Sequence, residues 1–270
     1  NTTADNNTAV GADVLGANTT GSNNTAVGAF ALDANTSASN NTAFGYDSLS
    51  ANTTGTRNTG LGAYTLQSNT TGTDVTAVGS NALASNTTGT NNTAVGRDAL
   101  KQNTTQSNNV AIGYRALINQ TVADQNTAIG ADAMYTNTTG EYCTAVGFMA
   151  LYNNNANSIT GVGYQALLSN TTGIENTAAG FAALEANTTG QHNTAVGHQA
   201  LKANTTAQYN TAVGRNALKT NVTGQYNTAI GMDALEANTA SYNTACGLRA
   251  LEANTSGSYN TAVGYNCLDV

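Results

Sequence analysis

One apolar pair recurs along the whole chain at a nearly constant distance. A glycine stands at positions 11, 28, 45, 62, 79, 96, 113, 130, 147, 163, 180, 197, 214, 231, 247 and 264, so every step is 17 residues except two of 16. An apolar residue precedes each of these glycines, and a leucine follows four residues after it, with Met134 as the one substitute. Such a period is typical of stacked coils that bury their hydrophobic side only against a neighbour. We therefore predict one solenoid domain over residues 1–270, with sixteen coils registered on Gly11, Gly28, Gly45 and so on to Gly264.

The segment Asn-Thr-Ala-Val-Gly of each coil is predicted to be a strand. Thr and Val should then point to one side, and Asn, Ala and Gly to the other. The Thr column changes once, to the apolar Val110, so we expect it to face the interior beside the Val and Leu columns. The Ala column admits only Ala or Gly, and the Gly column admits only Gly. This second side should be closely approached by backbone, either of the same coil or of another chain.

We expect chains to associate through that small-residue side. A 17-residue coil buries little apolar surface for the conformational entropy it loses, and a second chain would add burial. The predicted partner is the chain itself, in a homotrimer or similar bundle, and head-to-tail stacking into a filament is a further possibility. A self-sufficient single solenoid is the alternative. The predicted packing face is represented by Ala26, Gly28, Ala94, Gly96, Ala195, Gly197, Ala212 and Gly214.

The segment after each glycine contains residues that favour helix over strand, and it is predicted to be either a short helical or 3₁₀ turn or a second strand. Met232 to Glu236, for example, is rich in residues with high helix propensity. The fold class is therefore all-β, or β with a short helical turn per coil, in a parallel β-solenoid. The two 16-residue steps lose their residue in the Asn-Thr-Thr-Gly stretch, so this corner should accept deletion. At about 4.8 Å per coil the rod would be roughly 75 Å long.

Asparagine forms a column at the corner, and most of its members have Thr or Ser two residues later. This is formally a glycosylation sequon. The other interpretation is an Asn ladder, in which each side chain caps backbone groups and the neighbouring amide. Both stay open for Asn18, Asn35, Asn52, Asn69, Asn86, Asn103, Asn137, Asn170, Asn187, Asn204, Asn221 and Asn254, and a second column adds sequons at Asn6, Asn23, Asn40 and Asn91.

Two further columns have a side chain of one kind in successive coils. Tyr209, Tyr226, Tyr242 and Tyr259 should stack as an aromatic ladder, which packs the surface or binds sugars. A mixed-charge stripe, which we expect to be solvated, consists of Glu185, Lys202, Lys219, Glu236 and Glu252. Aligned columns of threonine also suggest an ice-binding surface. However, we expect the threonines of the strand to point into the interior of the coil.

Composition mainly excludes classes of partner and of functional site. The chain has no Pro or Trp, only 9% charged residues and a net charge of −7, so nucleic acid and membranes are not expected partners. The two histidines stand in different columns without a nucleophile and carboxylate around them, so we expect no enzyme, no cofactor and no metal site. Cys143, Cys246 and Cys267 occupy three different columns, and we expect free, buried thiols.

Units such as residues 193–201 and 260–265 resemble the repeats of phage tail-fibre-like and bacterial surface proteins. The strand motif is also similar to the head repeats of trimeric autotransporter adhesins, in which a Val-Ala-Ile-Gly strand builds a trimeric parallel β-roll. The likeness spans all 270 residues, although the 17-residue unit is longer than the adhesin unit. The resemblance implies a trimeric fibre, extracellular, on a cell surface or on a virion, used as a shaft or for attachment. We predict a structural fibre, with an ice-binding or carbohydrate-binding solenoid as the alternative.

Overall fold

The computed structural model describes residues 3–268, which form strands and turns and contain no helix. The contacts divide the chain into two compact units, residues 1–132 and 133–270, so a single domain over 1–270 stays a prediction. The first unit carries β1 (Thr8–Val10), β2 (Thr25–Val27), β3 (Thr42–Phe44), β4 (Thr59–Leu61), β5 (Thr76–Val78), β6 (Thr93–Val95), β7 (Val110–Ile112) and β8 (Thr127–Ile129). The second carries β9 (Thr144–Val146), β10 (Thr160–Val162), β11 (Thr177–Ala179), β12 (Thr194–Val196), β13 (Thr211–Val213), β14 (Thr228–Ile230), β15 (Thr244–Cys246) and β16 (Thr261–Val263).

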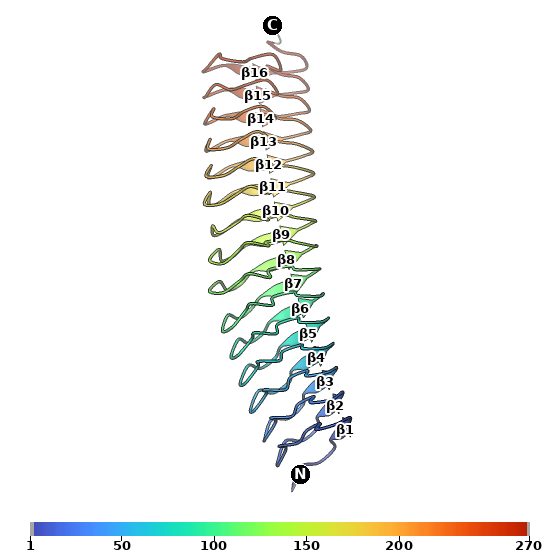
Figure 1. Ribbon diagram of the computed structural model, residues 1–270. Coiled ribbons are helices and arrows are strands. Elements are labelled where there is room, and N and C mark those ends of the chain that lie inside the picture. Colours follow the sequence, from blue (N-terminus) through green and yellow to red (C-terminus); the bar gives the residue numbers. More distant parts are fainter. Residues whose placement is uncertain (1–2, 269–270) are drawn as a thin grey trace. The chain divides into compact units, whose positions relative to one another are not determined.

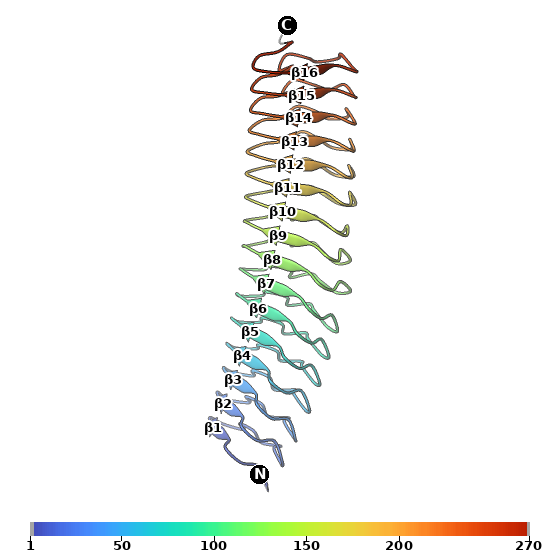
Figure 2. The same cartoon turned by 180° about the vertical axis from the view of Figure 1, so that it is seen from behind.

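Within each unit, consecutive strands pair in parallel and in register. Thr25 lies beside Thr42 and Ala26 beside Ala43 in the first unit, and Thr194 lies beside Thr211 in the second. Successive coils of a unit follow each other in chain order in both views (Figures 1 and 2). The chain is therefore a parallel β-solenoid with coils of about 17 residues, as the period predicts.

The strand turns its alanine inward and its threonine and valine outward, which is the reverse of the predicted orientation. Ala195 is fully buried, whereas Thr194 is half-buried and 39% of Val196 is exposed. Asn193 explains the choice because it points the same way as Ala195. Its amide donates to the Ala207 carbonyl at 2.8 Å, and its Oδ1 accepts the backbone N–H of Asn210 at 3.0 Å. These partners lie inside, so the asparagine side of the strand must be the inner side.

The core of most coils consists of two alanines and a leucine between two columns of asparagine. In one coil these are Ala195, Ala200 and Leu201, and all three are fully buried. Gly60 is one of two glycines in the first alanine column, and its neighbours explain why alanine is absent there. A Cβ there would lie 2.6 Å from the Ser48 hydroxyl and 2.8 Å from that of Thr65, and these two hydroxyls are 2.8 Å apart. The hydroxyl pair takes the space of the missing methyl group.

The small-residue side is closely approached by backbone, as predicted, and the backbone belongs to the same chain. Gly197 has φ = 137°, and a Cβ on it would overlap the Gly214 carbonyl of the next coil. The assignment of this side as a face between chains is wrong for its alanines, because their own chain covers them completely; these are Ala26, Ala94, Ala195 and Ala212. The glycines of the assignment, namely Gly28, Gly96, Gly197 and Gly214, are half-buried and separate the valine column from the residues that follow.

The segment after each glycine is a run of turns, so it is neither the short helical turn nor the second strand that the sequence left open. Ala200 N–H donates to the Gly197 carbonyl at 3.3 Å, and Asn204 N–H donates to the Leu201 carbonyl at 3.1 Å. Gln199 and Leu201 have φ of 57° and 51°, which a right-handed helix does not contain. Three non-glycine residues in each coil have such left-handed φ values, and none of those in the described part of the chain is β-branched. Bonds between coils override the local helix propensity.

Leu201→Ile tests the left-handed backbone. Isoleucine keeps the volume of leucine, but its branched Cβ makes left-handed φ costly, so we expect a loss of about 2 kcal/mol in the free energy of unfolding. Leu201→Met should cost less than about 1.5 kcal/mol, because Met134 already occupies this column with φ = 51°. Urea unfolding followed by circular dichroism measures both. Equal losses for the two variants would contradict this backbone.

The two 16-residue coils confirm that the corner accepts the deletion. In ordinary coils the corner asparagine donates to the carbonyl three residues later, as Asn187 does to Gly190 at 3.0 Å. Asn154 and Asn238 instead donate to the carbonyl two residues later, both at 2.8 Å. The cap is kept with one residue fewer, and the strand and the core leucine stay in register.

Candidate interaction face

An outer strand face, made of the Thr, Val and Gly columns of the strands, is the most uniform surface of each unit. None of its positions within the described residues carries a charge. In the second unit its apolar side chains are well exposed, with 39% for Val196, 37% for Val213 and 43% for Ile230. An exposed column on an ordinary solvated surface would be expected to take up charges, and large exposed apolar patches usually mark interaction sites.

A second ridge of exposed side chains is formed by the residues that directly follow the glycines. Phe148, Tyr164 and Phe181 stack in successive coils with ring centroids 5.5 and 5.0 Å apart. The ring of His198 extends this stack, 5.0 Å from that of Phe181. The column is less uniform than the outer strand face, since it holds Arg215 in the next coil. Along the chain, each glycine therefore stands between a residue of the valine column and a residue of this partly aromatic column.

The corner asparagines form a buried ladder, so the ladder interpretation is confirmed. Asn187 Nδ2 donates to Asn170 Oδ1 at 2.7 Å, and Asn204 Nδ2 donates to Asn187 Oδ1 at 2.7 Å. The ladder is incomplete at Gln120, which replaces asparagine and leaves Asn103 Oδ1 buried without a partner. The buried Oδ1 atoms of Asn204 and Asn221 also lack a partner.

Glycosylation does not fit the folded corner. Every corner asparagine of a sequon uses Nδ2, the atom that would carry the sugar, as a donor to a backbone carbonyl. All of them are buried except Asn254, which is half-buried. The candidate sites are therefore corrected to ladder residues. The second set of sequons, Asn6, Asn23, Asn40 and Asn91, lies exposed.

The predicted tyrosine ladder is present. The rings of Tyr209, Tyr226, Tyr242 and Tyr259 are stacked with centroids 5.0, 5.1 and 4.9 Å apart, and His192 adds a ring 4.8 Å from Tyr209. Sugars bind aromatic residues through the ring face. Because the neighbouring ring covers each inner face, this ladder favours packing over sugar binding.

The mixed-charge stripe is paired along its length. Lys202 lies 3.3 Å from Glu185, and Lys219 lies 3.3 Å from Glu236, with all four side chains partly exposed. Such pairs contribute little to stability. They show that the stripe is a solvated surface, in contrast to the outer strand face.

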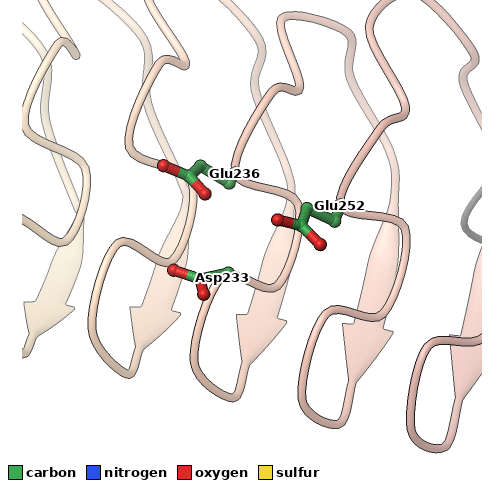
Figure 3. Close-up of side chains that lie close together, drawn as sticks. All are labelled: Asp233, Glu236 and Glu252. Carbon is green, nitrogen blue, oxygen red and sulfur yellow. The ribbon is translucent and has the colours of Figure 1, made fainter.

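A cluster of three carboxylates was missed by sequence reasoning. Asp233, Glu236 and Glu252 place one oxygen each within 4.8 Å of the others (Figure 3). The spacing of 3 and 16 residues, close to the coil period, is the signal that would have found it. Each carboxylate has a partner of its own: Asp233 accepts from Asn216 at 2.9 Å, Glu236 pairs with Lys219, and Glu252 lies 3.5 Å from Arg249. Lys219 and Arg249 therefore already offset two of the three negative charges, and Asp233 is held by a neutral amide.

The three cysteines are free, but they are not all buried as predicted. Cys143 replaces an inner asparagine, and its burial raises the pKa of the thiol to about 11. Cys246 is exposed because the valine column that contains it faces outward, and Cys267 is half-buried. Cys246 is therefore a natural reporter on the outer strand face.

Comparisons with known proteins give no family. No family model matches the chain, and no curated protein matches its sequence. Within the part of the chain that the structure describes, no helix has the length and hydropathy to cross a membrane. Function must therefore be argued from the columns themselves.

Proposed function

We propose that the chain is a shaft segment of a structural fibre, with a spacing or attachment role on a virion or a cell surface. The observation that carries this proposal is the repetition of the same stabilising bonds from coil to coil. The inner asparagines supply one side-chain ladder, the corner asparagines supply another, and the strands supply the backbone ladder. Coils held mainly by their neighbours can be added or removed to set a length, which is what a spacer needs.

Removal of whole coils tests this proposal. Deleting residues 181–214 takes out two coils and joins Gly180 to Arg215 in register. We expect a folded protein that is shorter by about 10 Å, at about 4.8 Å per coil. Small-angle scattering gives the maximum dimension, and circular dichroism gives the fold. Loss of folding, or an unchanged length, would contradict a modular shaft. Deletion of residues 181–205, which breaks the register, is the control that should unfold.

Ice binding is a second candidate function because the strand threonines are on the outside. Thr194, Thr211 and Thr228 follow one another in register and share their face with Val196 and Val213. Regularly spaced hydroxyl and methyl groups on a flat sheet, about 4.8 Å apart, can match a crystal lattice. Thermal hysteresis of the wild-type protein, lost in Thr194→Lys/Thr211→Lys, would support this function. Absence of hysteresis in the wild type would exclude it.

A further inference from the structure

We infer that the outer strand face is a contact surface between copies of this chain. It is apolar and exposed on the single chain, as Val196, Val213 and Ile230 show. It is also uncharged at each described position, although each chain has a net charge of −7. Like-charged chains approach most easily through an uncharged face, and interface cores are depleted of charged residues.

Periodicity favours a second copy over a different protein. The face repeats a threonine or valine, an uncharged and mostly apolar residue and a glycine in every coil, with a spacing of about 4.8 Å. A partner that contacts it along its length needs groups at the same spacing. A second copy of the chain provides this spacing in full, whereas a globular protein would match it at only a few coils.

Shape is also compatible with self-association. The half-buried Gly197 and Gly214 present no side chain between the ridge of Val196 and Val213 and the ridge that contains Phe181 and His198. Because glycine has no side chain, another copy can approach the backbone closely at these positions. Four residue positions across and eight coils along give roughly 500 Å² per unit. One unit from each of two copies would therefore bury about 1,000 Å² in total, which is the lower limit for a specific interface.

Two lysines on the face test the inference. We expect the wild type to sediment as a dimer or larger assembly of the 27.3 kDa chain. Val196→Lys/Val213→Lys should sediment as a single chain with unchanged circular dichroism, because the lysines are tolerated in solvent but not in an apolar contact. A matched control is Val122→Lys/Val222→Lys, which changes two exposed corner valines and should keep the wild-type mass. A single-chain wild type, or an unchanged mass of the face variant, would overturn the inference.

Labelling of the Cys246 thiol tests independently whether the contact lies on the outer strand face. In a Cys267→Ala background it is the reactive thiol, because Cys143 is buried and its pKa is raised. Maleimide labelling should be at least about tenfold slower in the assembly than in Val196→Lys/Val213→Lys, since access limits thiol reactivity. Equal labelling rates would place the contact elsewhere. The inference goes beyond the proposed fibre role: a single-chain rod that passes the coil-deletion test would refute the contact and leave the shaft in place.

Discussion

Gly197→Ala should abolish the fold of its coil, with a loss of more than about 4 kcal/mol in the free energy of unfolding. Two effects combine at this position. The backbone has φ = 137°, which side-chain-bearing residues rarely adopt, and the new methyl group would overlap the Gly214 carbonyl. Because that carbonyl is backbone of the next coil, no side-chain rotation relieves the overlap. Urea unfolding monitored by circular dichroism would show the loss.

Substitutions at two other glycines separate the effect of backbone strain from the effect of steric overlap. Gly264 has φ = 134°, but a Cβ there would meet only Cys267, at 3.9 Å, so Gly264→Ala should show an intermediate loss of about 1–3 kcal/mol. Gly16 has no positive φ, and the nearest atom to its Cβ is the end of the Asp33 side chain, which can move. Gly16→Ala should therefore change stability by less than about 1 kcal/mol. The order Gly197, Gly264, Gly16 is the prediction, and any other order would contradict the stacking.

The second large effect is expected from Asn187→Leu, with a loss of about 3–5 kcal/mol. Leucine has a similar shape but no amide, so Asn170 Oδ1 loses its donor, and the Gly190 carbonyl keeps only the Asn176 amide of its two side-chain donors. Asn204 Nδ2 also loses its acceptor on residue 187 and keeps only the Ala207 carbonyl. Asn170, Asn187 and Asn204 are fully buried, so water does not replace the missing partners. Urea unfolding measures the loss.

Thr189→Ala, two residues along the same corner, is the control for this variant. Thr189 is exposed and uses only its backbone N–H, to Thr205, so its change should stay within about 0.5 kcal/mol. Hydrogen exchange of the coils on either side adds a local test. It should speed up most next to residue 187, because coils are stabilised by their neighbours. Similar losses for Asn187→Leu and Thr189→Ala would show that the ladder adds nothing.

The period, the strand and the corner ladder could be predicted from the sequence because each is a repeated identity. An invariant glycine column indicates a backbone that excludes Cβ, and Gly197 against Gly214 is such a case. The asparagine of the corner is kept even where the coil is one residue shorter, as at Asn154, which indicates a capping role. Stacked tyrosines follow directly from equal spacing.

The sidedness of the strand could not be predicted from hydrophobicity alone. Thr and Val are more apolar than the Asn-Ala-Gly side, so the usual rule places them inside. The asparagine amides decide otherwise, because the backbone partners of Asn193 lie inside the solenoid, in its own coil and the next one. The conformation of the segment after each glycine could not be predicted for a similar reason. Leucine at φ near 51° is not suggested by any local preference and arises from bonds to the neighbouring coils, such as Leu201 N–H to the Ala217 carbonyl at 3.0 Å.

The most direct test of this account is a pair of single lysine substitutions on one strand, compared by circular dichroism and urea unfolding. Thr194 faces outward and Ala195 is fully buried. Thr194→Lys should keep the β-sheet spectrum and lose less than about 1 kcal/mol in the free energy of unfolding. Ala195→Lys should unfold its coils, because it buries an unpaired charge. A folded Ala195→Lys beside an unfolded Thr194→Lys would contradict the account, since it would place the threonine column inside.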